Sequence, residues 1–580
     1  MRPAGATRIA ALVAVLALCA APATRAQSPL PLDAFAPGLE ARAPGIRPGA
    51  PRLVVAFLFD QWRGDLVERY RPVFGKDGFV RVMDGGARFT DCTIPYAITF
   101  TGPGHATWLS GAPPSVHGIV DNGWYDRALG MDVACVEDPR FSAVGVTSGT
   151  EGEAASPRFM RAQTVADVLK STTLGRGKVI AVCDKARGAV LPAGRHPDGA
   201  YWLDGSTGLY QTSTYYESAL PAWLVAENAR RAQRLRASRG SSWVPRASLP
   251  ARVWAGTSSD PEDTFPHLLI LPKNAPGADG ADVKVKAPAV ALTQHPLALE
   301  GLFDFARAAL EGEQLGTDDT PDLLIISISA TDRVGHLFGA ESPEALDLAS
   351  RADSALADFM KLLDSKVGRG RWTVTVTADH GATPGKRTVR RFEAAPFDSV
   401  GNLSSQQIEA WIDRVLGAPA KGLKSVALSV DGGAVVFDPA KLQALGLTRE
   451  AAARIVADSA FANPWLSGGY TADDARHAGA GDPLLARVAL GWYPGRSGDV
   501  LLLTGADVFY DDSARTRAGH GGPQRDQRLV PFLLYGAGIR PGIYRQPIST
   551  LDIAATTARI LGIEPPAQCE GQARYEALAP

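Results

Sequence analysis

The chain has 580 residues, of which 45% are apolar and 21% are charged, and its 60 Lys and Arg nearly balance its 61 Asp and Glu. These fractions are typical of a globular protein and exclude disorder as the main state, because disordered chains are poor in apolar residues. A net charge of −1 argues against a dedicated nucleic-acid binder, which would carry a strong basic excess. At about 150 residues per domain the length suggests about four domains, although one large enzyme domain with insertions fits equally well.

Residues 1–26 are predicted to be a secretory signal peptide. Arg2 and Arg8 provide a positive start, residues 9–21 form an uncharged and mostly apolar run, and Ala26 supplies a small residue at the cleavage site. The run is shorter than the roughly 20 apolar residues that span a bilayer, and an uncleaved anchor is the alternative. We therefore expect an exported protein, periplasmic or secreted, with no transmembrane segment in the mature chain.

Beyond a proline-rich arm or linker at 27–51, continuous apolar runs alternate with helical patterns. Runs of this kind are typical of strands that are buried on both faces of a parallel sheet. The runs lie at Leu53–Phe59, 178–183, Asp322–Ile328, Trp372–Thr377, 499–504 and 529–535, and the helical patterns at 159–171, 299–313, 343–367 and 549–561. The alternation predicts an α/β fold with a mainly parallel central sheet sandwiched by helices.

Two stretches interrupt this alternation and are expected to be insertions that cap the sheet. The first, at about 200–295, is rich in Trp, Tyr, Pro and Ser. The second, at about 385–495, combines a helix, short strands and glycine-rich turns. We therefore expect one catalytic domain over 52–580, enlarged by these two insertions, in place of four separate domains.

Four cysteines remain after the predicted signal peptide: Cys92, Cys135, Cys183 and Cys569. In an exported protein they could form two disulfides, and their spacing leaves the connectivity open. Buried thiols without a disulfide are an equally good interpretation. The cysteines contain no CxxC pair, so we do not expect a structural zinc site.

Acidic and histidine side chains follow the predicted strands at the points where these strands end. They are Asp60, Asp332, His336, Asp379, His380 and His520. In open α/β sheets, ligands bind beyond the carboxyl ends of the strands. A set of Asp and His suits a borderline divalent metal such as zinc. Each pair alone is weak evidence, but four chain segments with the same chemistry predict a metal site.

Thr101 opens the segment TGPGHATWL, which we predict to be a tight turn that leads into a helix. The unpaired backbone N–H groups and the dipole of a helix start favour an anion. A divalent metal would lower the pKa of the threonine hydroxyl and make it a nucleophile. An N-cap role is the simpler alternative for Thr101, and Thr99 is a competing candidate for the nucleophile.

Seven motifs, spread from residue 52 to about 540, resemble the alkaline phosphatase superfamily. Within it they are most similar to the PafA-like, phosphate-irrepressible alkaline phosphatases, which use a threonine nucleophile. The motifs are VVAFLFDQWRGD (54–65), TGPGHATWLSGAPPSVHGIVDN (101–122), DKARGAVLPAG (184–194), YWLDGSTGLYQTSTYY (201–216), SATDRVGHLFG (329–339), TADHG (377–381) and GHGG (519–522). The set and its order are specific to that family.

The resemblance implies two zinc ions per chain, with Thr101 as the nucleophile. Asp332, His336 and His520 would hold one zinc ion. The other would be held by Asp60, Asp379, His380 and the hydroxyl of Thr101. In this family scheme Thr101 attacks phosphorus, a phospho-threonine forms, and its hydrolysis releases inorganic phosphate.

The resemblance also implies substrate-binding roles for three side chains. Lys185 and Arg187 would contact the non-bridging phosphoryl oxygens, a mark of monoesterases, although a solvated charged turn is the simpler alternative. Charge counting agrees, because two zinc ions would balance three aspartates and a threonine alkoxide and leave two cations for a dianion. Asn122 would donate to a phosphoryl oxygen, a role that diesterases share. The family turn usually carries Asp where this chain has Ala186, and the effect of that difference stays open.

We therefore expect a zinc-dependent phosphomonoester hydrolase that acts on small phosphomonoesters and binds no nucleic acid. The resemblance favours a monomer. The main alternative is a phosphodiesterase or nucleotide pyrophosphatase on the same two-zinc scaffold. An alternative from another class is a non-catalytic protein that binds phosphate or metal. The physiological substrate does not follow from the sequence.

Overall fold

A computed structural model describes residues 49–146, 154–246, 265–278, 289–384, 401–479, 481–513 and 515–579. The predicted signal peptide at 1–26 and nearly all of the predicted arm at 27–51 lie outside these residues, so both stay predictions.

The centre of the fold is a sheet of five parallel strands. β1 (Leu53–Phe59) pairs with β12 (Asp322–Ile328) and β13 (Trp372–Thr377), and β12 continues through β6 (Val179–Cys183) to β7 (Gly199–Leu203). Every residue of β1 is buried, which explains why its sequence is apolar without alternation. These strands confirm the predicted parallel centre of the sheet.

Antiparallel strands extend both edges of this sheet to a total of eleven strands. On one side, β20 (Leu529–Gly536) lies between β13 and β2 (Ala87–Thr93), and short strands flank β2. On the other side, β7 is followed by β8 (Tyr210–Ser213) and β5 (Ala143–Val144). The first residues of the stretch expected as an insertion at 200–295 thus belong to the central sheet. The strands beside β2 are β21 (Gly542–Tyr544) and β22 (Ile548–Ser549).

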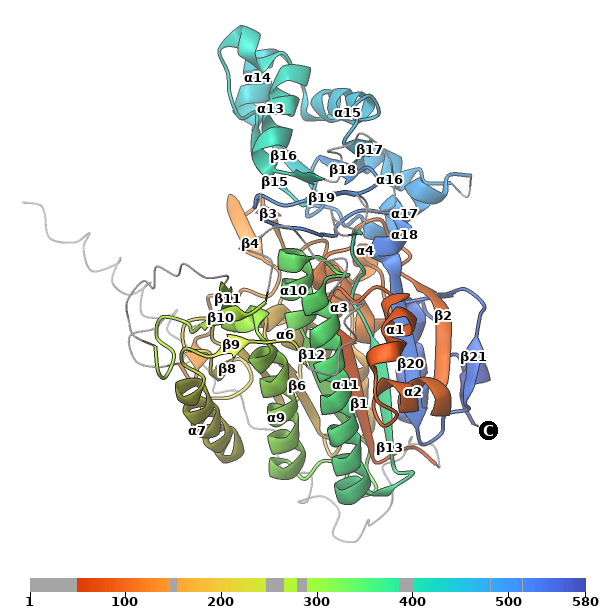
Figure 1. The fold of residues 1–580 in the computed structure, drawn as a ribbon. Coiled ribbons are helices and arrows are strands. Elements are labelled where there is room, and N and C mark those ends of the chain that lie inside the picture. The colour runs from red at the N-terminus through yellow and green to blue at the C-terminus, as the bar shows by residue number, and fades with distance from the viewer. Residues whose placement is uncertain are drawn as a thin grey trace, which may run out of the picture. The chain divides into compact units, whose positions relative to one another are not determined.

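Helices cover both faces of the sheet (Figure 1). One group packs together as α3 (Thr101–Ser110), α5 (Val165–Thr172), α6 (Ala186–Ala193) and α19 (Leu551–Ile560). The other group contains α2 (Phe79–Gly85), α7 (Ala222–Ala237), α9 (Pro296–Gly312), α10 (Ala330–Phe338) and α11 (Pro343–Leu363). The α/β sandwich predicted from the sequence is therefore confirmed.

The helix expected at 159–171 begins later than predicted. Thr164 accepts a hydrogen bond from the backbone N–H of Asp167, and the Asp167 side chain accepts one from the backbone of Thr164. This capping box fixes the start of α5 at Val165, because it satisfies N–H groups that a longer helix would use.

A second sheet of four antiparallel strands forms within residues 401–510. Its order is β15 (Ala427–Asp431), β16 (Ala434–Phe437), β18 (Val500–Thr504) and β17 (Leu466–Thr471). Helices α13 (Ser405–Val415), α14 (Pro439–Leu445) and α15 (Arg449–Ala460) enclose a hydrophobic core with this sheet. The sequence placed the run at 499–504 in the central sheet, which is wrong. A fully buried run predicts a strand but does not specify which sheet it joins.

The remaining elements are short and connect these layers. They are α1 (Leu66–Arg69), α4 (Pro114–His117), β3 (Gly123–Asp126), β4 (Met131–Ala134), β9 (Ser242–Trp243), β10 (His267–Ile270), β11 (Ala289–Ala291), β14 (Gly401–Leu403), α16 (Ala472–Arg476), α17 (Pro483–Gly491), β19 (Val508–Tyr510) and α18 (Arg525–Arg528).

The cysteines do not form the two disulfides considered above. Cys92, Cys183 and Cys569 carry free thiols, and the first two are buried. Burial raises the pKa of the Cys183 thiol to about 11. None of the helices among the described residues is both long enough and apolar enough to cross a membrane.

Candidate metal centre

The predicted ligands gather at one edge of the central sheet because three parallel strands end there together. Phe59 of β1 lies opposite Ile328 of β12, and Leu58 lies opposite Thr377 of β13. Asp60 directly follows β1, α10 directly follows β12 and its cap Ser329, and Asp379 comes two residues after β13. The register of the sheet therefore brings together segments that are far apart in the sequence.

The first group of ligands consists of Asp332, His336 and His520. Asp332 and His336 are one turn apart on α10, and Nε2 of His336 lies 3.0 Å from Oδ1 of Asp332. Nε2 of His520 lies 3.6 Å from the same oxygen. The Nδ1 atoms of both histidines donate to backbone carbonyls, at 2.9 Å and 2.7 Å. These outer hydrogen bonds fix the rings so that Nε2 faces the carboxylate, as in many metal sites.

The second predicted group consists of Asp60, Asp379 and His380, and Asp332 of the first group also lies close enough to Asp60 and His380 to share an ion with them. Nε2 of His380 lies 3.5 Å from Oδ1 of Asp60 and 3.4 Å from Oδ2 of Asp379, while its Nδ1 donates to the carbonyl of Gly381. The ring of His380 stacks on that of His520 with 3.7 Å between the centroids, so the two groups adjoin.

Among the described residues, three buried atoms of the second group have no hydrogen-bond partner: Oδ1 of Asp60, Oδ2 of Asp379 and Nε2 of His380. A buried polar atom without a partner costs free energy, and here both carboxylate oxygens lie within 3.5 Å of the unpartnered Nε2 of His380, so the three need an explanation. A divalent cation would satisfy all three. Three carboxylates and three imidazoles also form a donor set that suits zinc. The residues present therefore fit a metal.

The electrostatics of the cluster point the same way. Burial and the carboxylates of Asp332 and Asp379 raise the pKa of Asp60. Burial and the neighbouring His520 hold the pKa of His380 well below its ordinary value, so this imidazole is neutral and able to bind metal. Nearby carboxylates repel one another unless positive charge lies between them.

Lys185 supplies one positive charge inside this cluster. Its Nζ atom donates to Oδ2 of Asp60 at 2.7 Å and to Oδ2 of Asp332 at 2.6 Å. Burial alone would raise the pKa of Asp332, but Lys185 and His336 outweigh it and hold that pKa well below the ordinary range. The sequence placed Lys185 near a bound phosphoryl group, and the structure places it beside two of the predicted metal ligands.

Thr101 is the first residue of α3 and is only 1% exposed. His105, one turn later, lies with Nδ1 2.9 Å from the carbonyl of Thr101 and 3.2 Å from Oδ2 of Asp379. This contact ties the start of α3 to the second group of ligands. The competing candidate Thr99 donates its hydroxyl to the carbonyl of Gly522 and accepts from the N–H of Gly521. Thr99 therefore stabilises the loop that carries His520.

The two glycines of the TGPGH motif allow α3 to approach the metal ligands. A Cβ atom on Gly104 would lie 2.5 Å from the carbonyl oxygen of Asp379, and one on Gly102 would lie 2.7 Å from that of Asp121. Both distances are too short for a real contact, and the obstacle is backbone that cannot rotate away. Only glycine fits at these positions.

We expect Gly104→Ala to weaken metal binding by about 10- to 100-fold, because the added methyl group displaces Asp379. Competition with a chelator of known affinity measures this change. Gly205→Ala is the matched control, because a Cβ atom there meets no atom within 4 Å. Equal metal affinity in the two variants would contradict the role of Gly104.

Asn122 and Arg187 lie on segments that flank Thr101. Oδ1 of Asn122 accepts from the backbone N–H of Gly102 at 2.8 Å. Arg187 lies in the first turn of α6, and its buried Nε atom has no hydrogen-bond partner in the part of the chain that the structure describes. Ala186 is buried, and among the described residues neither carboxylate oxygen of Asp184 has a hydrogen-bond partner.

Sequence reasoning missed Gln61 and His105. Gln61 donates from Nε2 to Asp332 at 3.0 Å and from its backbone N–H to Asp379 at 3.1 Å, so it holds ligands of both groups. The backbone of Gln61 is in the left-handed conformation, with a φ of 64°, and this turn of the chain brings Gln61 to the ligands of both groups. The signal for Gln61 was its place directly after Asp60, and for His105 its place one turn after Thr101.

Comparisons with known proteins match most of the chain. A family model described as type I phosphodiesterase / nucleotide pyrophosphatase matches residues 54–517. Alkaline phosphatase PafA of Elizabethkingia meningoseptica is 32% identical over 91% of this chain and 94% of its own length. Alkaline phosphatase PhoV of Synechococcus elongatus is 30% identical over 90% and 92%. The crystal structure of wild-type PafA matches 91% of this chain and 99% of that chain with a TM-score of 0.79 and 30% identity.

Proposed function

Because this chain belongs to the type I phosphodiesterase / nucleotide pyrophosphatase family of the alkaline phosphatase superfamily, we propose that it is an alkaline phosphatase that hydrolyses phosphomonoesters. Relatives named alkaline phosphatases align with about nine-tenths of the chain. The observation that carries the proposal is the position of Lys185, which is buried against Asp60 and Asp332. It brings a cation into the site in addition to any bound metal.

The proposed cofactor is a pair of zinc ions. Asp332, His336 and His520 would hold one of them, and Asp60, Asp379, His380 and Thr101 would hold the other. When bound, two such ions lower the pKa of a coordinated hydroxyl and stabilise charge on the attacking and leaving oxygens. The unpaired atoms of Asp60, Asp379 and His380 support this assignment.

We propose that Thr101 is the nucleophile and carries the phosphoryl group as a phospho-threonine. Thr101 begins α3, so the N–H groups of the first helical turn would lie beside the oxygens of a phosphoryl group bound to it. Oδ1 of Asn122 is already engaged by Gly102, which leaves the amide NH₂ of Asn122 to donate to a phosphoryl oxygen. Water then completes the hydrolysis and inorganic phosphate leaves.

Lys185 and Arg187 are proposed to select monoesters. With the carboxylates and the alkoxide balanced by two divalent ions, their two charges match a monoester dianion better than a diester monoanion. A phosphodiesterase or nucleotide pyrophosphatase on the same scaffold is the second candidate, and the description of the matching family favours it.

Lys185→Ala is expected to lower kcat/KM for an aryl phosphate by about 100- to 1000-fold, and for its methyl diester by less than about tenfold. Steady-state kinetics on both substrates measure the change, and metal analysis checks that the ions stay bound. Lys361→Ala, which removes an exposed lysine, is the control. A wild-type preference for the diester that Lys185→Ala leaves unaltered would favour the second candidate.

We also propose that the protein is exported after removal of residues 1–26 and acts as a monomer on small phosphomonoesters, with no nucleic-acid partner. The composition of the N-terminus and the near-neutral charge support this. In the same proposal, residues 52–580 form one catalytic domain with two capping insertions.

A further inference from the structure

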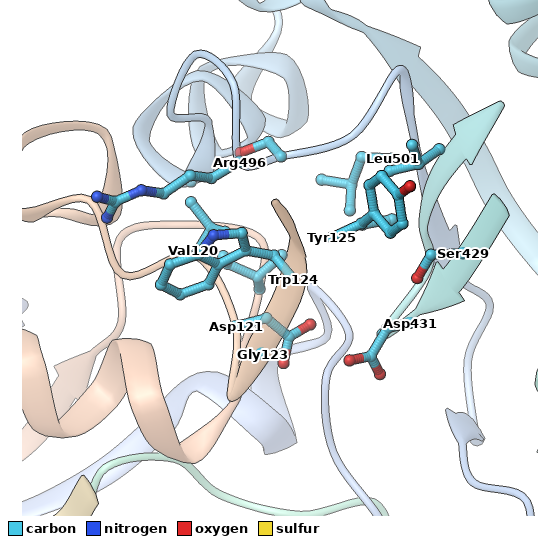
Figure 2. Close-up of a pocket in the computed structure, with 15 residues that line it drawn as sticks. Val120, Asp121, Gly123, Trp124, Tyr125, Ser429, Asp431, Arg496 and Leu501 are labelled. Atoms are coloured by element: carbon cyan, nitrogen blue, oxygen red, sulfur yellow. The ribbon is translucent and has the colours of Figure 1, made fainter. Parts of the chain in front are cut away.

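A pocket lies where the hairpin of β3 and β4 meets the four-stranded sheet (Figure 2). It is open to solvent. Its walls combine apolar and aromatic side chains with two carboxylates. The residues that matter here are Ile98, Trp124, Tyr125, Leu501, Asp121 and Asp431.

The pocket begins one residue away from the proposed phosphate site. Asp121 and Gly123, which line it, are the two neighbours of Asn122. Oδ1 of Asp121 accepts from the backbone N–H of Asn122 at 2.6 Å. Burial and Asp431 raise the pKa of Asp121, and Arg187 on α6 lies near enough to lower it by a smaller amount. A phosphoryl group held by Asn122 and Arg187 would therefore have this pocket beside it.

The turn between β15 and β16 contributes Gly432 to the wall of the pocket and packs against Asp121 and Phe100. A Cβ atom on Gly432 would lie 2.1 Å from Oδ2 of Asp121 and 2.8 Å from the ring of Phe100. The ring of Phe100, which precedes Thr101, lies 5.7 Å from that of His520. Phe100 thus connects the turn that lines the pocket with the residue of the proposed nucleophile.

Two carboxyl groups line the pocket: Asp121, only 7% exposed, and Asp431. Among the described residues neither forms an ion pair with Lys or Arg. Burial and Asp431 raise the pKa of Asp121, and burial together with Asp132 and Asp512 raises the pKa of Asp431, so a cation between the two would stabilise their ionised forms. The one cation in the wall, Arg496, lies 4.8 Å from the ring of Trp124 and donates to the carbonyls of Gly118 and Phe159. Its guanidinium points away from the two carboxylates (Figure 2).

Two carboxylates beside aromatic rings form a surface that suits a cation with an apolar shell. The face of an aromatic ring attracts ammonium groups, and unpaired carboxylates add a longer-range attraction. An anionic group would be repelled from the same place. A neutral alcohol would gain only the apolar contact.

We propose that this pocket holds the leaving group and selects phosphomonoesters whose alcohol carries an ammonium group. The inference rests on the proposed phosphomonoesterase function and extends it to a class of substrate. The phosphoryl group would lie at Thr101, and the ammonium group would lie between Trp124 and the pair formed by Asp121 and Asp431.

A matched pair of substrates tests this inference. Phosphocholine and 3,3-dimethylbutyl phosphate have the same shape, but only the first carries a positive charge. We expect the metal-loaded enzyme to prefer phosphocholine by about tenfold in kcat/KM, and Asp431→Asn to reduce the preference to about twofold or less. Methyl phosphate, which does not reach the pocket, should react equally with both proteins. Asp458→Asn, an exposed aspartate of α15, is the control.

Calorimetric titration of the metal-loaded enzyme with choline gives a readout that needs no turnover. If choline binds and Asp431→Asn abolishes this binding, the pocket is supported. Should the same enzyme hydrolyse no monoester, that failure would refute only the proposed function. Hydrolysis of both substrates at equal rates, with no change in Asp431→Asn and no choline binding, would overturn the inference and leave the phosphatase proposal intact.

Discussion

Thr101→Ala is expected to lower kcat/KM for an aryl phosphate by at least about a thousandfold, because it removes the only group that we propose to attack phosphorus. The fold should persist. Thr101 begins α3 without acting as its N-cap, and the backbone carbonyl that contacts His105 stays in place. Release of inorganic phosphate measures the effect, and metal analysis shows whether the ions remain.

Two further variants separate nucleophilic attack from a structural role. Thr101→Ser keeps a hydroxyl and should retain most of the activity. Thr99→Ala removes the hydroxyl that holds the loop of His520, so it should lower stability and metal affinity more than the chemical step. Near wild-type turnover in Thr101→Ala would refute the assignment of the nucleophile.

Removal of the metal should abolish phosphate release and lower Tm by roughly 5–10 °C. Three carboxylates and two stacked imidazoles would then lie together with Lys185 as the main compensating charge. Dialysis against a strong chelator, followed by calorimetry and activity assays, measures both effects. Zinc added back should restore them.

His380→Ala should reproduce the loss in part, because it deletes one ligand of the second group. His477→Ala is the matched control, since His477 directly follows α16, is exposed and is not one of the predicted ligands. Full activity after complete removal of divalent ions would contradict the proposed cofactor.

The sequence predicted the parallel centre of the fold well because burial on both faces leaves a plain signature. The predicted bounds of β1, β12 and β13 match the structure. The same signature at 499–504 was misleading, since β18 is equally buried but belongs to the second sheet. Burial depends on what covers a strand, and the sequence of the strand does not specify its neighbours.

The candidate site was predictable to the same extent. Asp60, Asp332 and Asp379 could be found because parallel strands end at one edge, so their place follows from the topology. Gln61 and His105 could not, because their contacts depend on the backbone twist at Gln61 and on the close packing of α3 allowed by Gly104. These are features of three-dimensional packing.

The proposed phospho-threonine is tested most directly by the stereochemistry of phosphoryl transfer. An aryl phosphate made chiral at phosphorus with oxygen isotopes can be used to transfer its phosphoryl group to an alcohol acceptor. Each in-line displacement inverts phosphorus, so attack by Thr101 followed by transfer to the alcohol predicts net retention of configuration. Net inversion would show a single direct displacement and would contradict the account.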